Sequence, residues 1–307
     1  MRRFTNPGLN PAKPTPYEVC KFLLTRRHRP WPKWTDYPKK APPPLRVPAI
    51  ARETRMTYVS HSTCLIQTGG LNVITDPVFG HRIGPFGILG HRRHHDPGVS
   101  FEDLPDIDLC LLSHDHFDHL ELPSVKRIAA QKRGGGDHQR RLTVCTGLGV
   151  KRRLPNFPSL KVHEMDWSGR YLIDKNTTLW GSFLIKTPDH VVFFAGDTGY
   201  NQKHFFAIRD RLKSVGRVID LALLPIGCFS PEWFQRDFHM SPDDAVAAHR
   251  DLGALKSVSI HFETFQLAEE SPREATDRLV DAKKRRGLQL HEFVTLSPGD
   301  HVVLKSL

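Results

Sequence analysis

The chain has 307 residues, of which 39% are hydrophobic, and a net charge of +11 at pH 7. This length suits one large domain, or a domain with an extension, because a single core grows to about 250–300 residues before a chain divides. No apolar run approaches the roughly 18 residues of a spanning helix, which excludes an integral membrane protein.

The surplus of positive charge favours an anionic partner, but charge alone does not choose between nucleic acid, phospholipid headgroups and a phosphate-bearing substrate. The N-terminus reads MRRFTNPGLNP and lacks the apolar core of a secretory signal. Five cysteines, odd in number and widely spaced, suit reduced thiols. We therefore expect a cytoplasmic or peripheral-membrane, intracellular location.

Residues 1–50 hold many of the chain's prolines. We predict an extended Pro-rich arm there, without regular helix or central strand, followed by a single domain over 51–307. Trp31, Trp34 and Tyr37 are expected to pin the arm to the body of the protein; the alternative is an amphipathic patch for a membrane or partner.

From Met56 onward the pattern changes to apolar runs. Residues 57–77 predict two short strands around a Gly69-Gly70 turn. A short apolar run over 108–113 predicts a buried strand, and a helix is predicted over 121–131.

The second half of the chain alternates buried runs with helix signals. HVVFFAGDTG, DLALLPIG and SVSIH predict strands, while Ser241-Pro242-x-Asp244 and Ser271-Pro272-x-Glu274 have the form of capping boxes that start helices. This order predicts a layered α/β protein with polar residues at strand ends.

The strand over 108–113 leads into a dense cluster of metal-ligand residue types: Ser113-His114-Asp115-His116-Phe117-Asp118-His119. Imidazole and carboxylate, with no thiolate nearby, are typical of a catalytic zinc site. On a tight loop, His114 and His116 can face one metal while Asp118 and His119 face a second. The alternative is a polar helix N-terminus with Asp118 as the capping carboxylate.

The pattern H-x-H-x-D-H after an apolar strand resembles the signature of the metallo-β-lactamase superfamily. More narrowly, the chain resembles the N-acylphosphatidylethanolamine-hydrolysing phospholipase D family over nearly its whole length, beginning with Arg3-Phe4-x-Asn6-Pro7. Further motifs carry this resemblance: His61-Ser62-Thr63, Thr75-Asp76-Pro77, Leu104-Pro105-x-Ile107-Asp108, Leu179-Trp180-Gly181-Ser182, Phe194-Ala195-Gly196-Asp197-Thr198-Gly199-Tyr200, Leu224-Pro225-Ile226-Gly227 and Ile260-His261.

The resemblance implies a four-layer αββα sandwich with two zinc ions at one edge of the sheets. Carried over by position, Asp197 would bridge the two metals, and His261 would complete the second site with Asp118 and His119. Taken alone, Asp197 has the alternative of an Asx-turn residue, and His261 that of a buried histidine bonded to backbone.

The resemblance also implies roles around the metals. His61 and Asp76 would support the ligands, because a carboxylate that accepts an N–H fixes the tautomer of a ligand imidazole; either is alternatively a turn residue. His239 would lie near the substrate phosphate, with a solvent-facing residue ahead of the next helix as its alternative. Asp118, Asp197 and His239 are thus the expected catalytic residues.

The family pattern breaks at residues 166–170. Asp166-Trp167 runs directly into Ser168-Gly169-Arg170, where the family has a Thr-Pro-x-Gln-His type stretch that supplies a further histidine to the first metal. The resemblance therefore implies that one strand and one ligand are missing and that the first zinc site is weakened. His163 and His190 are not expected to substitute. Phe262-Glu263 also departs from the family's Trp-Gly.

By resemblance, water activated by two metals would cleave an N-acylated phosphatidylethanolamine to an N-acylethanolamine and phosphatidic acid. The expected partners are an anionic phospholipid and a peripheral membrane surface, and the basic loop Gly90–His95 suits such a surface. No nucleic acid is expected as a partner. The sequence is compatible with a homodimer. Two alternatives remain: another hydrolase of this fold, such as a lactonase or nuclease, and a catalytically impaired zinc-binding remnant.

Overall fold

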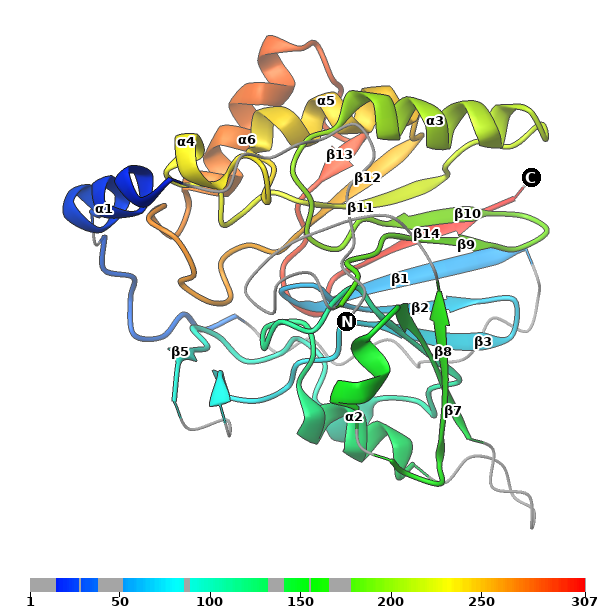
Figure 1. Ribbon diagram of the computed structural model, residues 1–307. Coiled ribbons are helices and arrows are strands. Elements are labelled where there is room, and N and C mark those ends of the chain that lie inside the picture. Colours follow the sequence, from blue (N-terminus) through cyan, green and yellow to red (C-terminus); the bar gives the residue numbers. More distant parts are fainter. Residues whose placement is uncertain are drawn as a thin grey trace.

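Two β-sheets form the centre of the molecule, which is a computed structural model (Figure 1). The structure describes residues 15–27, 29–37, 52–85, 89–131, 141–154, 156–165 and 178–306. The seven-stranded sheet has the order β14 (His301–Lys305), β1 (Glu53–Ser60), β2 (Thr63–Thr68), β3 (Leu71–Thr75), β6 (Leu109–Leu112), β7 (Leu142–Gly147) and β8 (Leu160–Met165). The five-stranded sheet has the order β13 (Phe293–Val294), β12 (Lys256–Ile260), β11 (Leu221–Pro225), β10 (Val191–Phe194) and β9 (Phe183–Lys186).

Helices cover the outer face of each sheet (Figure 1). The five-stranded sheet is covered by α3 (Gln202–Lys213), α5 (Pro242–Leu252) and α6 (Glu274–Arg285), and the seven-stranded sheet by α2 (Leu122–Ala129). Outside the layers lie α1 (Pro16–Thr25), α4 (Glu232–Gln235), the small sheet of β4 (Arg82–Ile83) and β5 (His91–Arg92), and the 3-10 helices Phe101–Asp103 and Val150–Arg153. The predicted four-layer αββα sandwich is confirmed.

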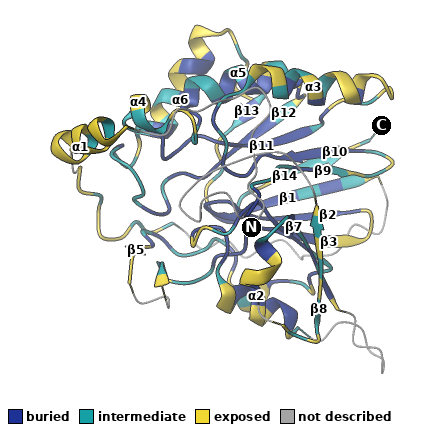
Figure 2. Cartoon of the chain, viewed as in Figure 1, coloured by how far each residue is buried: buried dark blue, intermediate teal, exposed yellow. Residues whose placement is uncertain are grey.

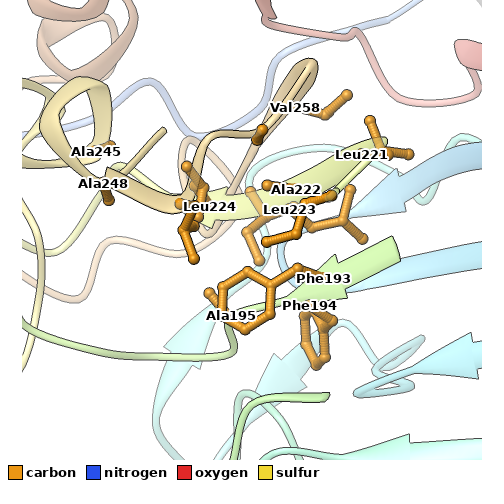
Figure 3. Close-up of a cluster of buried hydrophobic side chains, with 14 of the residues drawn as sticks. Phe193, Phe194, Ala195, Leu221, Ala222, Leu223, Leu224, Ala245, Ala248 and Val258 are labelled. Carbon is orange, nitrogen blue, oxygen red and sulfur yellow. The ribbon is translucent and has the colours of Figure 1, made fainter. Parts of the chain in front are cut away.

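The main hydrophobic core lies around the five-stranded sheet. Strands β10, β11 and β12 run parallel, and every residue of β10 and β11 is buried, as expected for strands covered on both faces. Figure 3 shows Phe193 and Phe194 of β10 beside the leucines of β11, with Ala245 and Ala248 of α5 on the side of Leu224. The sheet is therefore held between helices on one side and the larger sheet on the other.

Several local predictions are confirmed with small shifts. Residues 57–77 form parts of three strands rather than two, because β1 precedes the hairpin of β2 and β3 around Gly69-Gly70. Helix α5 begins at Pro242 with the predicted capping box, whereas α6 begins at Glu274 and not directly after Ser271. The proposed missing strand near residues 166–170 lies outside the described residues.

The N-terminal arm corrects one prediction, because residues 16–25 form the helix α1 and not extended chain. Pro16 is its first residue, where a missing N–H costs nothing, and Thr15 and Glu18 form a capping box. The indole of Trp31 donates to the carbonyl of Glu270, and the hydroxyl of Tyr37 donates to Glu263, so both pin the arm as expected. Trp34 instead donates to Asp36 within the arm.

The loop 90–95 is also less exposed than its charge suggests. Arg93 is 2% exposed and donates to the carbonyls of Gly80 and Val78 and to the hydroxyl of Ser60. His95 is equally buried, between the carbonyl of Asp96 and the hydroxyl of Thr264. Arg93 and His95 are therefore structural and do not present charge to a membrane.

Burial lowers the pKa of His95 to about 4. The unfolded chain, with a histidine pKa near 6.5, then binds more protons between pH 6.5 and pH 4, so stability falls as pH falls through this window. We expect His95 to contribute about 2 kcal/mol to the loss of unfolding free energy between pH 7 and pH 5. Urea unfolding of the wild type and His95→Gln at both pH values checks this; equal pH dependence in both proteins would contradict it.

No helix in the part of the chain that the structure describes combines the length and the hydropathy that a bilayer-spanning segment needs.

Candidate metal centre

The predicted site residues meet where strands of both sheets end. His61 lies between β1 and β2, Asp76 follows β3, and the run from His114 to His119 follows β6. From the other sheet, Asp197 follows β10 and His261 follows β12. The sandwich thus brings residues that are 200 positions apart in the sequence to one edge.

The backbone at this edge is unusual. Five described residues other than glycine have a positive φ, and His61, Asp76 and His261 are three of them. Such conformations cost roughly 1–3 kcal/mol each and gather at functional sites. Gly196, at φ +61, precedes Asp197, and a Cβ there would lie 2.6 Å from the Cβ of Ser113. Only glycine lets the two strand ends approach this closely.

Four ligand atoms approach one another closely at this edge, and the residues that carry them are named the tetrahedral set: Asp118, His119, Asp197 and His261. The Nε2 atom of His119 lies 3.3 Å from Asp118 Oδ2 and 3.2 Å from Asp197 Oδ2. The Nε2 atom of His261 lies 3.4 Å and 3.2 Å from the same two oxygens. Metal–ligand distances of about 2.0–2.1 Å in tetrahedral geometry place ligand atoms about 3.3–3.4 Å apart. The four measured distances therefore match the spacing of ligands around one divalent cation.

Unpaired buried atoms point to the same conclusion. Both carboxylate oxygens of Asp197, both ring nitrogens of His261 and the Nε2 atoms of His114 and His119 are buried without a hydrogen-bond partner. Buried polar atoms are rarely left unpaired, because each costs about 1–3 kcal/mol. An Asx turn at Asp197 or a backbone bond at His261 would have satisfied these atoms, so neither alternative holds.

The electrostatics of the cluster also favour a cation. Burial opposes protonation of His261, yet Asp197 and Asp118 raise its pKa to about 9, and the same carboxylates raise the pKa of His119 well above its usual range. Burial likewise opposes ionisation of Asp197, yet His119 and His261 hold its pKa well below its usual value. The carboxylates make the site electrically negative. In the absence of a metal, the two histidines bind protons that balance this charge.

The other half of the centre is less complete. The Nε2 atom of His114 lies 3.9 Å from Asp197 Oδ2, and His114, His119 and Asp197 form a second group with metal-ligand spacing. His116 is exposed and belongs to no such group among the described residues, although its ring lies 4.5 Å from that of His114. In the part of the chain that the structure describes, the predicted first site is thus only partly assembled.

Asp76 and Ser113 support the ligands from behind. Asp76 is fully buried, and its carboxylate accepts from the Nδ1 atom of His119 at 2.6 Å and from the backbone N–H and hydroxyl of Ser113. The bond to Nδ1 leaves the Nε2 atom of His119 free to face the metal. The sequence did not predict this supporting role of Ser113. Its position between the buried strand and the histidine motif was the one signal that could have indicated it.

Replacing Asp76 with asparagine should weaken metal binding about 10–100-fold, because the amide no longer fixes the His119 ring as the carboxylate does. Asp115→Asn is a matched control from the same run. Asp115 instead accepts from Thr178 and Arg153, so its replacement should leave metal affinity unchanged. Competition with a metal-binding dye measures both affinities; equal effects of the two replacements would contradict the role of Asp76.

His61 and His239 flank the tetrahedral set. The Nε2 atom of His61 lies 3.2 Å from Asp118 Oδ2, and His61 forms a group of metal-ligand spacing with Asp118, His119 and His261. His61 thus has the spacing of a ligand, where the sequence predicted only a supporting residue. The Nδ1 atom of His239 lies 3.8 Å from Asp197 Oδ2, and the ring is mostly covered rather than facing solvent.

Other residues lie where the sequence did not place them. Trp180 packs against the rings of His114 and His116, with centroid distances of 4.3 and 4.9 Å, and its motif had given no hint of this. His190 contacts Thr54 and Ser306 away from the site, and His163 is exposed on β8. Neither residue belongs to a group of metal-ligand spacing among the described residues.

Comparison with known proteins agrees with this geometry. A family model described as "Beta-lactamase superfamily domain" matches residues 71–262. An uncharacterized protein of Mycobacterium tuberculosis is 34% identical, covering 79% of this chain and 68% of that protein. An N-acyl-phosphatidylethanolamine-hydrolyzing phospholipase D of Caenorhabditis elegans is 31% identical, covering 80% of this chain and 74% of that protein.

Among solved structures, a possible metal-dependent hydrolase of Veillonella parvula has a TM-score of 0.62 at 14% identity, covering 81% of this chain and 98% of its own, which shows a shared fold. The strand-end ligands, the matched domain and the shared fold have one explanation. The chain belongs to the metallo-β-lactamase superfamily of metal-dependent hydrolases, and to the family that includes the N-acyl-phosphatidylethanolamine-hydrolyzing phospholipases D.

Proposed function

We propose that this chain is a zinc-dependent phosphodiesterase that hydrolyses N-acylated phosphatidylethanolamine to an N-acylethanolamine and phosphatidic acid. The tetrahedral set of Asp118, His119, Asp197 and His261 is the observation that carries the hydrolase chemistry. The relative from Caenorhabditis elegans supports the substrate. Histidine nitrogen and carboxylate oxygen, without thiolate, support zinc as the metal.

Bound zinc would lower the pKa of a water molecule toward 7 and stabilise charge on the phosphoryl oxygens. In the overall reaction, a water oxygen bonds to phosphorus, and the bond from phosphorus to the ethanolamine oxygen breaks. That oxygen takes a proton and leaves as the alcohol. Asp118 and Asp197 would hold the negative charge that attracts the cation, and His239, 3.8 Å from Asp197 Oδ2, would exchange a proton with the reacting oxygens.

His239 fits this role through its environment. Burial lowers its pKa to about 4, so the ring is neutral at pH 7, and its Nδ1 atom has no hydrogen-bond partner. A neutral imidazole beside the metal centre can hydrogen-bond a phosphoryl or leaving oxygen. His239 also shares metal-ligand spacing with Asp197 and His261, so direct metal binding is the competing role.

The test uses the full chain purified without chelator, with its metal content measured. Product formation from detergent-dispersed N-acylated phosphatidylethanolamine should depend on the metal, disappear after chelation and be absent in Asp197→Asn. Asp115→Asn should keep its activity, because Asp115 faces Thr178 and Arg153 and not the cluster.

Two results would overturn the proposal. A metal-loaded chain that leaves this lipid intact but opens a lactone or cleaves RNA would be another hydrolase of the same fold. A chain that binds metal but turns over none of these substrates would be the impaired zinc-binding remnant that the missing histidine suggested.

A further inference from the structure

Helix α1 turns its apolar side chains away from the protein. At 100° per residue, Tyr17, Val19, Cys20, Leu23 and Leu24 share one side of the helix. Tyr17, Leu23 and Leu24 are 74, 64 and 86% exposed. Figure 2 shows α1 as exposed along almost its whole length, at the edge of the molecule. This is the reverse of a helix that packs on a core, whose apolar side faces inward.

The outward orientation is held by contacts on the opposite side. Only Glu18 and Phe22 of the helix are half-buried, and they lie one turn apart. The ring of Phe22 stacks on Phe234 of α4 with centroids 4.5 Å apart, and the ammonium group of Lys21 lies 4.7 Å from the ring of Trp233. Trp233 is itself 40% exposed and extends the apolar surface beyond α1.

Positive charge borders this surface. Lys21, Arg26 and Arg27 are exposed on or directly after α1, in a chain of net charge +11. Glu18 is the only acidic residue of the helix, and it is engaged in the capping box with Thr15. An apolar stripe bordered by cations is complementary to a bilayer with anionic headgroups, where each basic residue near the surface contributes favourably.

A second copy of the chain fits this surface less well. A two-fold interface pairs the same patch with itself, so Arg26 and Arg27 of both copies would approach each other. Like charges brought together in an interface cost free energy. An anionic lipid surface has no such conflict.

The surface is coupled to the metal centre through α4. The backbone N–H of His239 donates to the carbonyl of Gln235, the last residue of α4, at 2.9 Å, and the ring of His239 lies beside Asp197. A contact made by α1 and Trp233 would therefore hold the segment before His239 close to the lipid.

We propose that α1, together with Trp233, docks this protein on an anionic phospholipid surface and so brings the metal centre to its lipid substrate. The proposal rests on the phospholipid substrate proposed above. The apolar stripe would insert at the level of the headgroups, and Lys21, Arg26 and Arg27 would contact lipid phosphates.

The test is co-sedimentation of the full chain with vesicles of phosphatidylcholine and phosphatidylglycerol, compared with pure phosphatidylcholine. The wild type should bind the anionic vesicles, and less so at high salt. Leu23→Asp combined with Leu24→Asp should weaken binding about tenfold or more, because two inserted leucines become charged. Leu255→Asp combined with Leu290→Asp is the matched control, since these leucines are 61 and 70% exposed elsewhere, and should bind like the wild type.

Turnover of detergent-dispersed substrate separates this proposal from the proposed function. The α1 variant should keep that turnover and lose turnover of substrate in anionic vesicles. Vesicle binding without any turnover would overturn the proposed function and leave the docking surface in place. Equal binding by the variant and the wild type, or a wild type that ignores anionic vesicles, would overturn the docking surface. A change from dimer to monomer in the variant, by light scattering, would assign the stripe to a second copy instead.

Discussion

Replacing His261 with alanine is expected to weaken metal binding by more than about a hundredfold and to abolish turnover. His261 supplies one of four ligand atoms at tetrahedral spacing, and the other three are Asp118 Oδ2, His119 Nε2 and Asp197 Oδ2. Loss of a direct ligand must exceed the roughly 10–100-fold effect that loss of a supporting group causes. Metal content after dialysis, together with a dye-competition titration, measures the effect.

His114→Ala is the informative companion. The nearest approach of His114 to the shared carboxylate is 3.9 Å, and its partner in the predicted first site, His116, is exposed. We therefore expect this variant to keep the metal of the tetrahedral set and lose only a second, weaker equivalent. If His114→Ala released all metal while His261→Ala kept one equivalent, the roles assigned to the two halves of the centre would be reversed.

Proton release provides an independent measure of the same site. With Asp197 and Asp118 raising the pKa of His261 to about 9, the metal-free ring is protonated at pH 7. A metal must displace that proton, so apparent affinity should rise as pH increases toward 9. The His261→Ala variant lacks this group and should show a weaker dependence on pH.

The ligand positions were predictable because they follow from strand ends. Buried runs before His114, Asp197 and His261 predict parallel strands, and parallel strands end at one edge of a sheet. Within each sheet, a residue that directly follows one parallel strand is therefore expected near the residues that follow the other parallel strands. Pairing between the two sheets, which brings Asp118 within 3.4 Å of His261, needed the family resemblance as well.

Other features depended on packing that no local pattern reveals. Residues 16–25 read as part of a Pro-rich arm, yet one proline at the first helical position is compatible with a helix, and Phe22 finds an aromatic partner in Phe234, more than 200 residues away. The loop 90–95 is rich in charge, yet Arg93 is buried because the carbonyls of Gly80 and Val78 and the hydroxyl of Ser60 accept its hydrogen bonds. Charge predicts exposure only where such partners are absent.

His239 should be the most sensitive residue that is not part of the tetrahedral set. We expect His239→Ala to lower kcat by between about a hundredfold and ten-thousandfold, the range typical of a lost proton-transfer group. The metal of the tetrahedral set should stay bound, because the Nδ1 atom of His239 lies 3.8 Å from Asp197 Oδ2, beyond the 3.2–3.4 Å of that set.

The comparison of His239→Ala with His239→Gln shows which feature of the ring matters. Glutamine keeps a hydrogen-bond donor but cannot exchange a proton near neutral pH, so it should recover KM more than kcat if proton transfer is the role. Because burial lowers the pKa of His239 to about 4, the wild-type ring is neutral throughout the assay range above pH 6. A variant that loses one metal equivalent instead would make His239 a ligand, and the proton would then have to come from another group at this edge.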